Sequence, residues 1–134
     1  MSDRRAVTAE GAPAAIGPYS HAVVANGLVF AAGQVGSDPA TGELVEGGVT
    51  SQAKRALANV EAILRAAGSG LDRVVKTTIF LADMADFAAV NEAYAERMPE
   101  PYPARTTVAV RALPKGALVE IECVGLATDP RRAS

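Results

Sequence analysis

The last third of the chain alternates apolar and polar residues over two runs, and this constrains the fold more strongly than any other sequence feature. Residues 103–122 form the two runs on either side of Leu113-Pro114-Lys115-Gly116, and each has the two-residue period of a β-strand. The pattern predicts a β-hairpin with that segment as its turn. One face carries polar and charged side chains: Arg105, Thr107, Arg111, Glu120 and Glu122. The opposite face carries mainly apolar ones: Thr106, Val108, Val110, Val119 and Ile121.

Two earlier segments are also typical of a hairpin. Residues 20–25 and 28–32 flank Asn26-Gly27, a dipeptide that tolerates the positive φ angles of a type I′ turn. After a loop that contains several glycines, Thr50 or Ser51 is expected to cap a helix. One face of this helix is apolar: Ala53, Leu57, Val60, Ile63 and Leu64.

Residues 74–81 predict a further strand, and Asp83 is expected to cap a second helix. The apolar face of that helix comprises Phe87, Val90, Tyr94 and Met98. With the element order β-β-α-β-α-β-β, we expect an α+β two-layer sandwich in a single domain of residues 1–134. Both helices would cover one face of a mixed sheet. The face with Arg105 and Glu120 would stay uncovered and is a candidate interface between subunits.

Composition and charge exclude several classes of function. The formal net charge of -2 leaves no broad basic surface, so nucleic acid is not expected as the main partner. Cys123 is the single cysteine and His21 the single histidine, which excludes an internal disulfide and argues against a metal site. No targeting segment is evident, and no run approaches the roughly 20 apolar residues that cross a bilayer. We therefore expect a cytoplasmic protein.

A series of segments links the chain to a known family: Gly17-Pro18-Tyr19, Ala32-Gly33-Gln34-Val35, residues 75–81, Asp86-Phe87 with Val90-Asn91, Pro103-Ala104-Arg105, and Leu113-Pro114 with Glu120-Ile121-Glu122. In this order and spacing they resemble the RidA (YjgF) family over nearly the whole chain. The resemblance implies a chorismate-mutase-like fold assembled as a homotrimer, with ligand sites between subunits. It also implies the activity of a 2-iminobutanoate/2-iminopropanoate deaminase, which hydrolyses imine and enamine acids to 2-oxo acids and ammonia without a cofactor.

The resemblance assigns roles to individual residues. It implies that Arg105 holds the substrate carboxylate, that Glu120 acts on water, and that Tyr19 and Gly33 line the pocket. It implies a pocket contact from the backbone of Thr107 as well. A guanidinium can grip a carboxylate through two parallel hydrogen bonds, and a carboxylate can move the proton of an attacking water, so these residue types suit the reaction.

The predicted hairpin also has a geometric consequence for this site. If Leu113 to Gly116 is a four-residue turn, Arg105 faces Val124, and Glu120 lies four positions away, or roughly 13 Å at the usual rise of a strand. That distance is large for one small substrate. We therefore expect each pocket to take Arg105 from one subunit and Glu120 from its neighbour.

Some residues depart from the family pattern or have another interpretation. Thr107 stands where some members have cysteine, and Ala32 stands where a serine often precedes the glycine. His21 is interpreted as structural rather than as a base, and Cys123 as a small buried hydrophobe that points toward the helices. Two alternative functions remain: a non-catalytic trimeric binder of small 2-oxo acids, and a ribonuclease or translation inhibitor, which the acidic charge disfavours.

Overall fold

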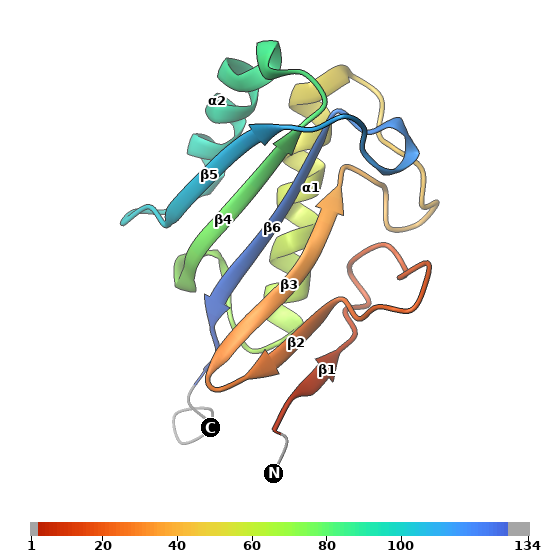
Figure 1. Ribbon diagram of the computed structural model, residues 1–134. Helices are drawn as coiled ribbons and strands as arrows, with labels where there is room; N and C mark the ends of the chain where they lie inside the picture. The colour runs from red at the N-terminus through yellow and green to blue at the C-terminus, as the bar shows by residue number, and fades with distance from the viewer. Residues whose placement is uncertain (1–2, 129–134) are drawn as a thin grey trace.

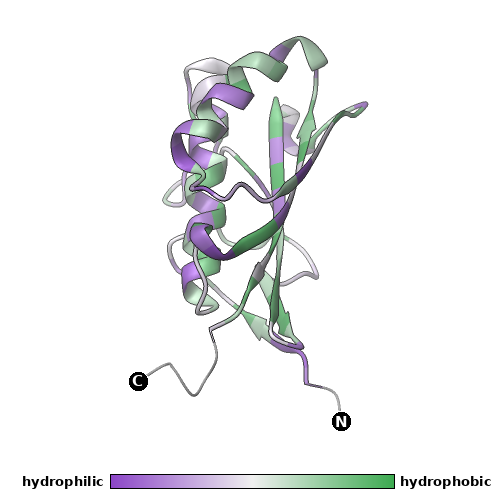
Figure 2. Ribbon diagram, turned by 90° about the vertical axis from the view of Figure 1, so that its left-hand side faces the viewer, coloured by the Kyte–Doolittle hydropathy of each residue, from purple (hydrophilic) through white to green (hydrophobic). Residues whose placement is uncertain are grey.

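The computed structural model describes residues 3–128, which form one six-stranded sheet with two long helices on the same face (Figure 1). The strands are β1 (Arg5–Val7), β2 (Ala22–Ala25), β3 (Leu28–Val35), β4 (Val74–Leu81), β5 (Ala104–Ala109) and β6 (Val119–Leu126). The helices are α1 (Gly48–Ala66) and α2 (Phe87–Arg97), with short 3-10 turns η1 (Leu71–Arg73), η2 (Met84–Asp86) and η3 (Pro114–Gly116). Figure 2 shows the helices in one layer and the other face of the sheet uncovered. The predicted α+β two-layer fold is confirmed.

The first hairpin forms where the sequence predicts it. Strands β2 and β3 pair antiparallel, and the turn residues Asn26 and Gly27 have φ angles of 51° and 75°, as a type I′ turn requires. Strand β3 runs beyond the predicted end to Val35, because a β-bulge between Ala31 and Gln34 lets the pairing with β6 continue. Strand β1, which pairs antiparallel with β2, was not predicted, since three residues are too few to show a period.

Helix α1 starts earlier than Thr50 or Ser51, the predicted capping residues. It begins at Gly48, and Gly47 precedes it with a φ of 111°, a left-handed conformation that glycine adopts without strain. No side chain caps this end. The predicted apolar face is confirmed, since its residues are all buried: Ala53, Leu57, Val60, Ile63 and Leu64.

Two buried polar side chains of α1 tie the helix to loops near the ends of β3 and β6. Asn59 is fully buried, and its Nδ2 donates to the carbonyls of Val35 and Ser37 at 3.2 and 2.9 Å. The Oε1 of Gln52 accepts a hydrogen bond from the Leu118 amide at 2.8 Å. These bonds satisfy backbone groups beside the sheet and fix the positions of the two strand ends.

The second helical region and β4 largely follow prediction. Strand β4 has the predicted bounds, and Val90, Tyr94 and Met98 are buried. Asp83 caps the short turn η2 by accepting a hydrogen bond from the Ala85 amide at 2.9 Å, so it precedes α2 without capping that helix itself. Phe87, the first residue of α2, is exposed at 40% and lies outside the core.

The predicted hairpin of residues 103–122 is wrong. The strand order is β1-β2-β3-β6-β4-β5, so β4 lies between β5 and β6 and pairs with both, parallel to β5 and antiparallel to β6. Strands two places apart are about 10 Å from each other. Residues 110–118, which contain η3, are long enough to span that gap, whereas a tight turn is not. Arg105 accordingly pairs with Thr77 of β4 rather than facing Val124.

This topology reverses the predicted facing of β5. Its register opposes Thr77 to Arg105 and Ile79 to Thr107, and both β4 residues are buried under the helices. Arg105 and Thr107 therefore point to the helix side, and Thr106 and Val108 point to the open face. For β6 the prediction is correct: Val119, Ile121 and Cys123 are buried under the helices, and Glu120 and Glu122 lie on the open face.

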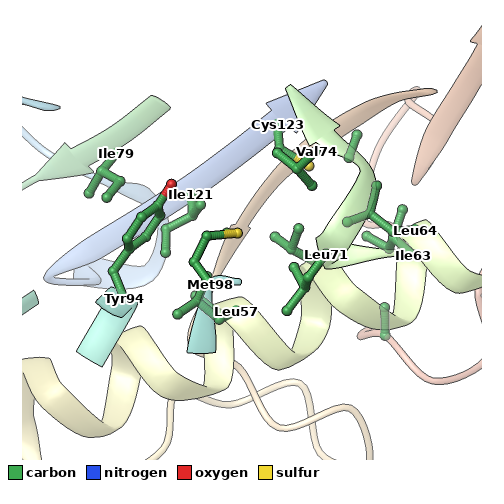
Figure 3. Close-up of a cluster of buried hydrophobic side chains, with 14 of the residues drawn as sticks. Leu57, Ile63, Leu64, Leu71, Val74, Ile79, Tyr94, Met98, Ile121 and Cys123 are labelled. Atoms are coloured by element: carbon green, nitrogen blue, oxygen red, sulfur yellow. The ribbon is translucent and has the colours of Figure 1, made fainter. Parts of the chain in front are cut away.

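The core fills the space between α1, α2 and the centre of the sheet (Figure 3). Its largest fully buried side chains are aliphatic: Leu57, Ile63, Leu64, Ile79, Leu81 and Ile121. Complete burial of each such side chain contributes about 1.5–3 kcal/mol relative to exposure. The core thus holds β4 and β6 in the middle of the sheet and leaves β5 at its edge.

Candidate functional site

A hollow of about 510 Å³ lies on the open face, where β3 and β6 meet the loop that precedes β2. Tyr19, Gly33 and Glu120 all line it, together with Ile16 and Lys115. Three of the residues that we predicted for the site are therefore brought together, although they lie far apart in the sequence. Arg105 and Thr107 do not line this hollow.

Gly33 leaves room for the Glu120 side chain in the conformation that the structure shows. It lies within the β-bulge of β3, and a Cβ at this position would lie 2.5 Å from Glu120 Oε2 and 3.0 Å from its Cδ. Cβ atoms essentially never approach another atom that closely. The absence of a side chain at Gly33 therefore allows the carboxylate to cross β3 and reach the hollow.

The environment of Glu120 raises the pKa of its carboxyl above the ordinary value. Burial is the larger cause, because it disfavours the charged form, and the negative charge of Glu122 adds to it. Within residues 3–128 no arginine or lysine forms a salt bridge with Glu120. Lys115 lines the same hollow, but its Nζ donates to the carbonyl of Gly42. A raised pKa makes the Glu120 carboxylate a stronger base than an exposed glutamate, which suits a group that accepts and returns a proton.

The loop before β2, which carries Ile16 and Tyr19, is anchored by His21. The Ala9 amide donates to His21 Nδ1 at 2.9 Å, and His21 Nε2 lies 2.8 Å from the Pro13 carbonyl. Both contacts are satisfied by the neutral tautomer that carries its proton on Nε2. The ring is also buried. The structural interpretation of His21 is therefore confirmed. Tyr19 itself is exposed, and its hydroxyl accepts a hydrogen bond from the Ile16 amide at 3.3 Å.

Arg105 lies on the other face of the sheet, among side chains of α2. Its Cζ is 5.0 Å from the ring centroid of Tyr94 and 5.6 Å from that of Phe87. The Tyr94 hydroxyl and Thr77 Oγ1 are hydrogen-bonded at 2.8 Å. Thr107 points to the same side, and its buried Oγ1 has no hydrogen-bond partner among the described residues. Arg105 therefore stands at an aromatic patch, made by Phe87 and Tyr94, at the edge of the sheet.

A single chain cannot present Arg105 and Glu120 to one small ligand. The two side chains leave opposite faces of the sheet, and β4 separates their strands. The predicted hairpin would have separated Arg105 from Glu120 by roughly 13 Å along one face of the sheet. In the structure the two side chains lie on opposite faces instead. The two residues do not converge, but the reason differs from the predicted one.

Cys123 has the environment predicted for it. It is buried on the helix side of β6, and burial raises the pKa of its thiol to about 12, with a smaller contribution from Glu122. The thiolate form is thus suppressed at neutral pH, and the residue acts as a small apolar side chain. Over the described part of the chain, no three His, Cys, Asp or Glu side chains gather closely enough to hold a metal ion.

Two features of the site were missed from the sequence. The aromatic patch was assigned to packing, although Phe87 and Tyr94 are seven residues apart and so share one face of α2. Lys115 was assigned to a turn, and its φ of 60° with the adjacent Gly116 does mark a strained loop that projects over the hollow. The spacing along α2 is the one signal that could have identified the patch.

Comparison with known proteins places this chain in a family. The family model described as Endoribonuclease L-PSP matches residues 9–127. A goat 2-iminobutanoate/2-iminopropanoate deaminase is 50% identical over 123 residues, which cover 92% of this chain and 90% of the goat protein. The chain belongs to the RidA (YjgF) family.

Solved structures of this family superpose closely on the chain. The crystal structure of RidA from the Antarctic bacterium Psychrobacter sp. PAMC 21119 has a TM-score of 0.87 and 46% identity, over 91% of this chain and 98% of that one. The structure of TdcF from E. coli with bound serine has the same TM-score and 38% identity, over 92% and 99% of the two chains. Within residues 3–128 of this RidA-family chain, no helix is long and apolar enough to cross a membrane.

Proposed function

We propose that this RidA-family protein hydrolyses 2-imino and enamine acids, of the 2-iminobutanoate and 2-aminoacrylate type, to 2-oxo acids and ammonia without a cofactor. The reaction takes place at sites between subunits of a homotrimer. The observation that carries the proposal is the hollow in which Glu120, with its raised pKa, lies beside Gly33 and Tyr19. The deaminase named among its relatives, at 50% identity, supports the same reaction.

Arg105 supplies the group that binds the substrate carboxylate. A planar guanidinium forms two parallel hydrogen bonds with a carboxylate and thereby fixes the neighbouring C2 atom. Within residues 3–128 no carboxylate forms a salt bridge with Arg105, so its donors are available to a ligand. The serine bound to TdcF, a related protein, also carries an α-carboxylate.

Glu120 handles the proton of the attacking water. The iminium carbon is already electrophilic, so a positioned water adds to C2 as the Glu120 carboxylate accepts its proton. The tetrahedral intermediate carries one hydroxyl and one amino group on C2. Glu120 returns the proton to the amino group, the C–N bond breaks, and the hydroxyl oxygen becomes the carbonyl oxygen of the 2-oxo acid as Glu120 accepts the hydroxyl proton. Ammonia takes this proton from Glu120 and leaves as ammonium, which restores the carboxylate.

The uncovered face of the sheet supports assembly through a second and third copy of the chain. Phe30 and Val108 lie on that face and are exposed at 45% and 38%, whereas Val29, Ile79 and Ile121 on the helix side of the same sheet are buried. A neighbour packed there removes these side chains from water. It also brings an Arg105 from its own sheet edge to the hollow, which one chain alone cannot do.

A coupled enzyme assay tests the proposed deaminase activity. Purified protein is added to a threonine or serine dehydratase, and release of the 2-oxo acid is followed in a medium where spontaneous imine hydrolysis is slow. We expect acceleration that scales with the added protein. Unchanged release would contradict the proposal.

A Glu120→Gln variant separates catalysis from binding. Loss of the proton acceptor is expected to lower kcat by at least about 100-fold. Binding of 2-oxobutanoate, measured by calorimetry, should change little, because the Arg105 contact is kept. If the native protein binds 2-oxobutanoate but does not accelerate hydrolysis, the chain is a non-catalytic binder of 2-oxo acids instead.

The family description also names an endoribonuclease, so a second activity needs a test. The formal net charge of -2 provides no basic surface for phosphates, which disfavours it. RNA cleavage by purified protein that is lost in Arg105→Ala would reverse this ranking. We also propose that residues 1–134 act as a single domain in the cytoplasm.

A further inference from the structure

The Arg105 side chain is held by the faces of two aromatic rings from one helix. Its Cζ lies 5.0 Å from the Tyr94 centroid and 5.6 Å from the Phe87 centroid. Both distances fall within the range of cation–π attraction, which strengthens as the contact is shielded from water. Phe87 is exposed at 40% and Tyr94 at 4%, so Tyr94 provides the closer and better shielded contact.

A guanidinium held by its face keeps its N–H edge free. Arg105 is half-buried, and none of the salt bridges within residues 3–128 includes it, so the rings are the contacts that direct it. Two-point binding of a carboxylate needs that edge to point in a defined direction, because the two hydrogen bonds must be parallel. The two rings thus set the orientation in which the Arg105 guanidinium binds its ligand.

Tyr94 is itself fixed by the strand next to Arg105. Its hydroxyl is hydrogen-bonded to Thr77 Oγ1 at 2.8 Å, and Thr77 is 1% exposed. Thr77 is also the residue of β4 that opposes Arg105 in the parallel register with β5. Thr77 therefore positions both ends of Arg105. Its backbone pairs with the backbone of Arg105, and its hydroxyl holds the Tyr94 ring that contacts the guanidinium.

We propose that Tyr94, held by Thr77, is a positioning residue that sets the direction in which Arg105 presents its guanidinium to a substrate carboxylate. This inference rests on the proposed role of Arg105 in carboxylate binding. It identifies a buried residue of α2 as a determinant of substrate affinity.

The test compares Tyr94→Leu with the conservative Tyr94→Phe. Without the ring, the Kd for 2-oxobutanoate and the KM for the imino acid are expected to rise about tenfold. The kcat should fall by less than about threefold, because the carboxylate contact is made in the ground state and the transition state alike. Tyr94→Phe keeps the ring face and the packing of the ring but loses the hydrogen bond to Thr77. It should therefore have the smaller effect and hold both constants within about threefold of the native protein.

A spectroscopic readout reports the ring contact directly. The Arg105 Nε–H resonance in ¹⁵N-labelled protein, assigned by its loss in Arg105→Gln, is expected to be displaced by the ring current of Tyr94. The displacement should persist in Tyr94→Phe and shrink in Tyr94→Leu to the part that the Phe87 ring causes. An unchanged resonance in Tyr94→Leu would show that the ring does not hold the guanidinium.

Two controls separate the possible failures. Val90→Ala removes buried volume from the same helix and should lower the unfolding temperature without changing the KM, which excludes a general effect of loosening α2. Arg105→Gln should abolish 2-oxobutanoate binding. If it does and Tyr94→Leu still binds normally, the positioning role is wrong and the proposed function stands; if Arg105→Gln binds normally, the proposed carboxylate role of Arg105 is wrong.

Discussion

At the scale of single residues, the shape of the hollow on the open face depends on the close approach of Gly33 and Glu120. The position has room for a hydrogen atom only, since a Cβ would meet the Glu120 carboxylate at 2.5 Å. The atom that it would meet belongs to a side chain and not to the backbone. The requirement for glycine at position 33 therefore comes from Glu120, and it should vanish when Glu120 is shortened.

A double-mutant cycle tests this dependence. Gly33→Ala is expected to lower the unfolding free energy by about 0.5–1.5 kcal/mol in the native background, because the Glu120 side chain must leave its preferred conformation to avoid the new methyl group. In a Glu120→Ala background the same change should cost little, since the clashing atoms are gone. Chemical denaturation of the four proteins measures the coupling. Equal costs in both backgrounds would show that the backbone of β3, and not Glu120, requires the glycine.

A second residue-scale prediction concerns the pH dependence of catalysis. Burial and the charge of Glu122 both hold the pKa of Glu120 above its ordinary value, so Glu120 keeps its proton to a higher pH. If ionised Glu120 accepts the proton of water, kcat/KM rises as the pH rises through this pKa. Glu122→Gln removes the repulsion, lowers the pKa, and should move the acid limb of the profile to lower pH.

The matched control for that profile is Glu92→Gln. Glu92 is exposed on α2, on the far side of the sheet from Glu120, so its charge is screened by solvent. Its removal should leave the acid limb in place. A shift of the limb to higher pH in Glu122→Gln would contradict the assigned cause.

At the scale of elements, α1 positions the end of β3 through polar as well as apolar contacts. Asn59 lies in a helix whose inward face is otherwise mostly aliphatic, and it donates to the carbonyls of Val35 and Ser37 beside the end of β3. A buried carbonyl without a partner costs about 1–3 kcal/mol. The side-chain amide of Asn59 thus helps to hold the end of β3, which lines the hollow.

Replacement of Asn59 by leucine tests this link. The side chain keeps about the same volume but donates no hydrogen bond, so the unfolding free energy should fall by about 2–4 kcal/mol. Arg55→Met removes only the Arg55 Nε bond to Asn59 Oδ1, at a half-buried position, and should cost less than about 1 kcal/mol. Similar costs for both variants in urea unfolding would contradict the role of the two carbonyl contacts.

At the scale of the whole molecule, the sheet itself divides the candidate site. Glu120, Gly33 and Tyr19 face one side, and Arg105 with its aromatic patch faces the other. In the proposed homotrimer the edge strand β5 of one subunit reaches the open face of the next. Each site then needs an intact Arg105 and an intact Glu120 from two different chains.

Complementation between inactive variants tests this division. Arg105→Gln and Glu120→Gln should each be nearly inactive alone. When they are co-expressed in equal amounts and assemble at random, roughly one quarter of the sites pair an intact Arg105 with an intact Glu120 from the neighbour, so roughly one quarter of native activity should return. A mixture as inactive as its components would show that both residues must come from one chain.

The elements of the fold could be predicted because each depends on local chemistry. Asn26-Gly27 tolerates positive φ, residues 74–81 favour an extended chain, and the apolar face of α1 recurs at helical spacing. The pairing of the strands could not be predicted in the same way. A tight turn at Leu113 to Gly116 and a longer connection past one strand fit the same residues, and only the competition for the central position in the sheet decides between them.

The sequence by itself therefore determined the helices, nearly all the strands, the two-layer architecture, and the choice of Arg105, Gly33 and Glu120 as candidate residues. The tertiary structure alone decided that β4 lies between β5 and β6. That single insertion turned Arg105 to the helix side, because a strand's facing follows the buried residues of its hydrogen-bonded neighbour, here Thr77 and Ile79. The side chain of Arg105 then met Tyr94 and Phe87, a contact between non-neighbouring segments that no local pattern specifies.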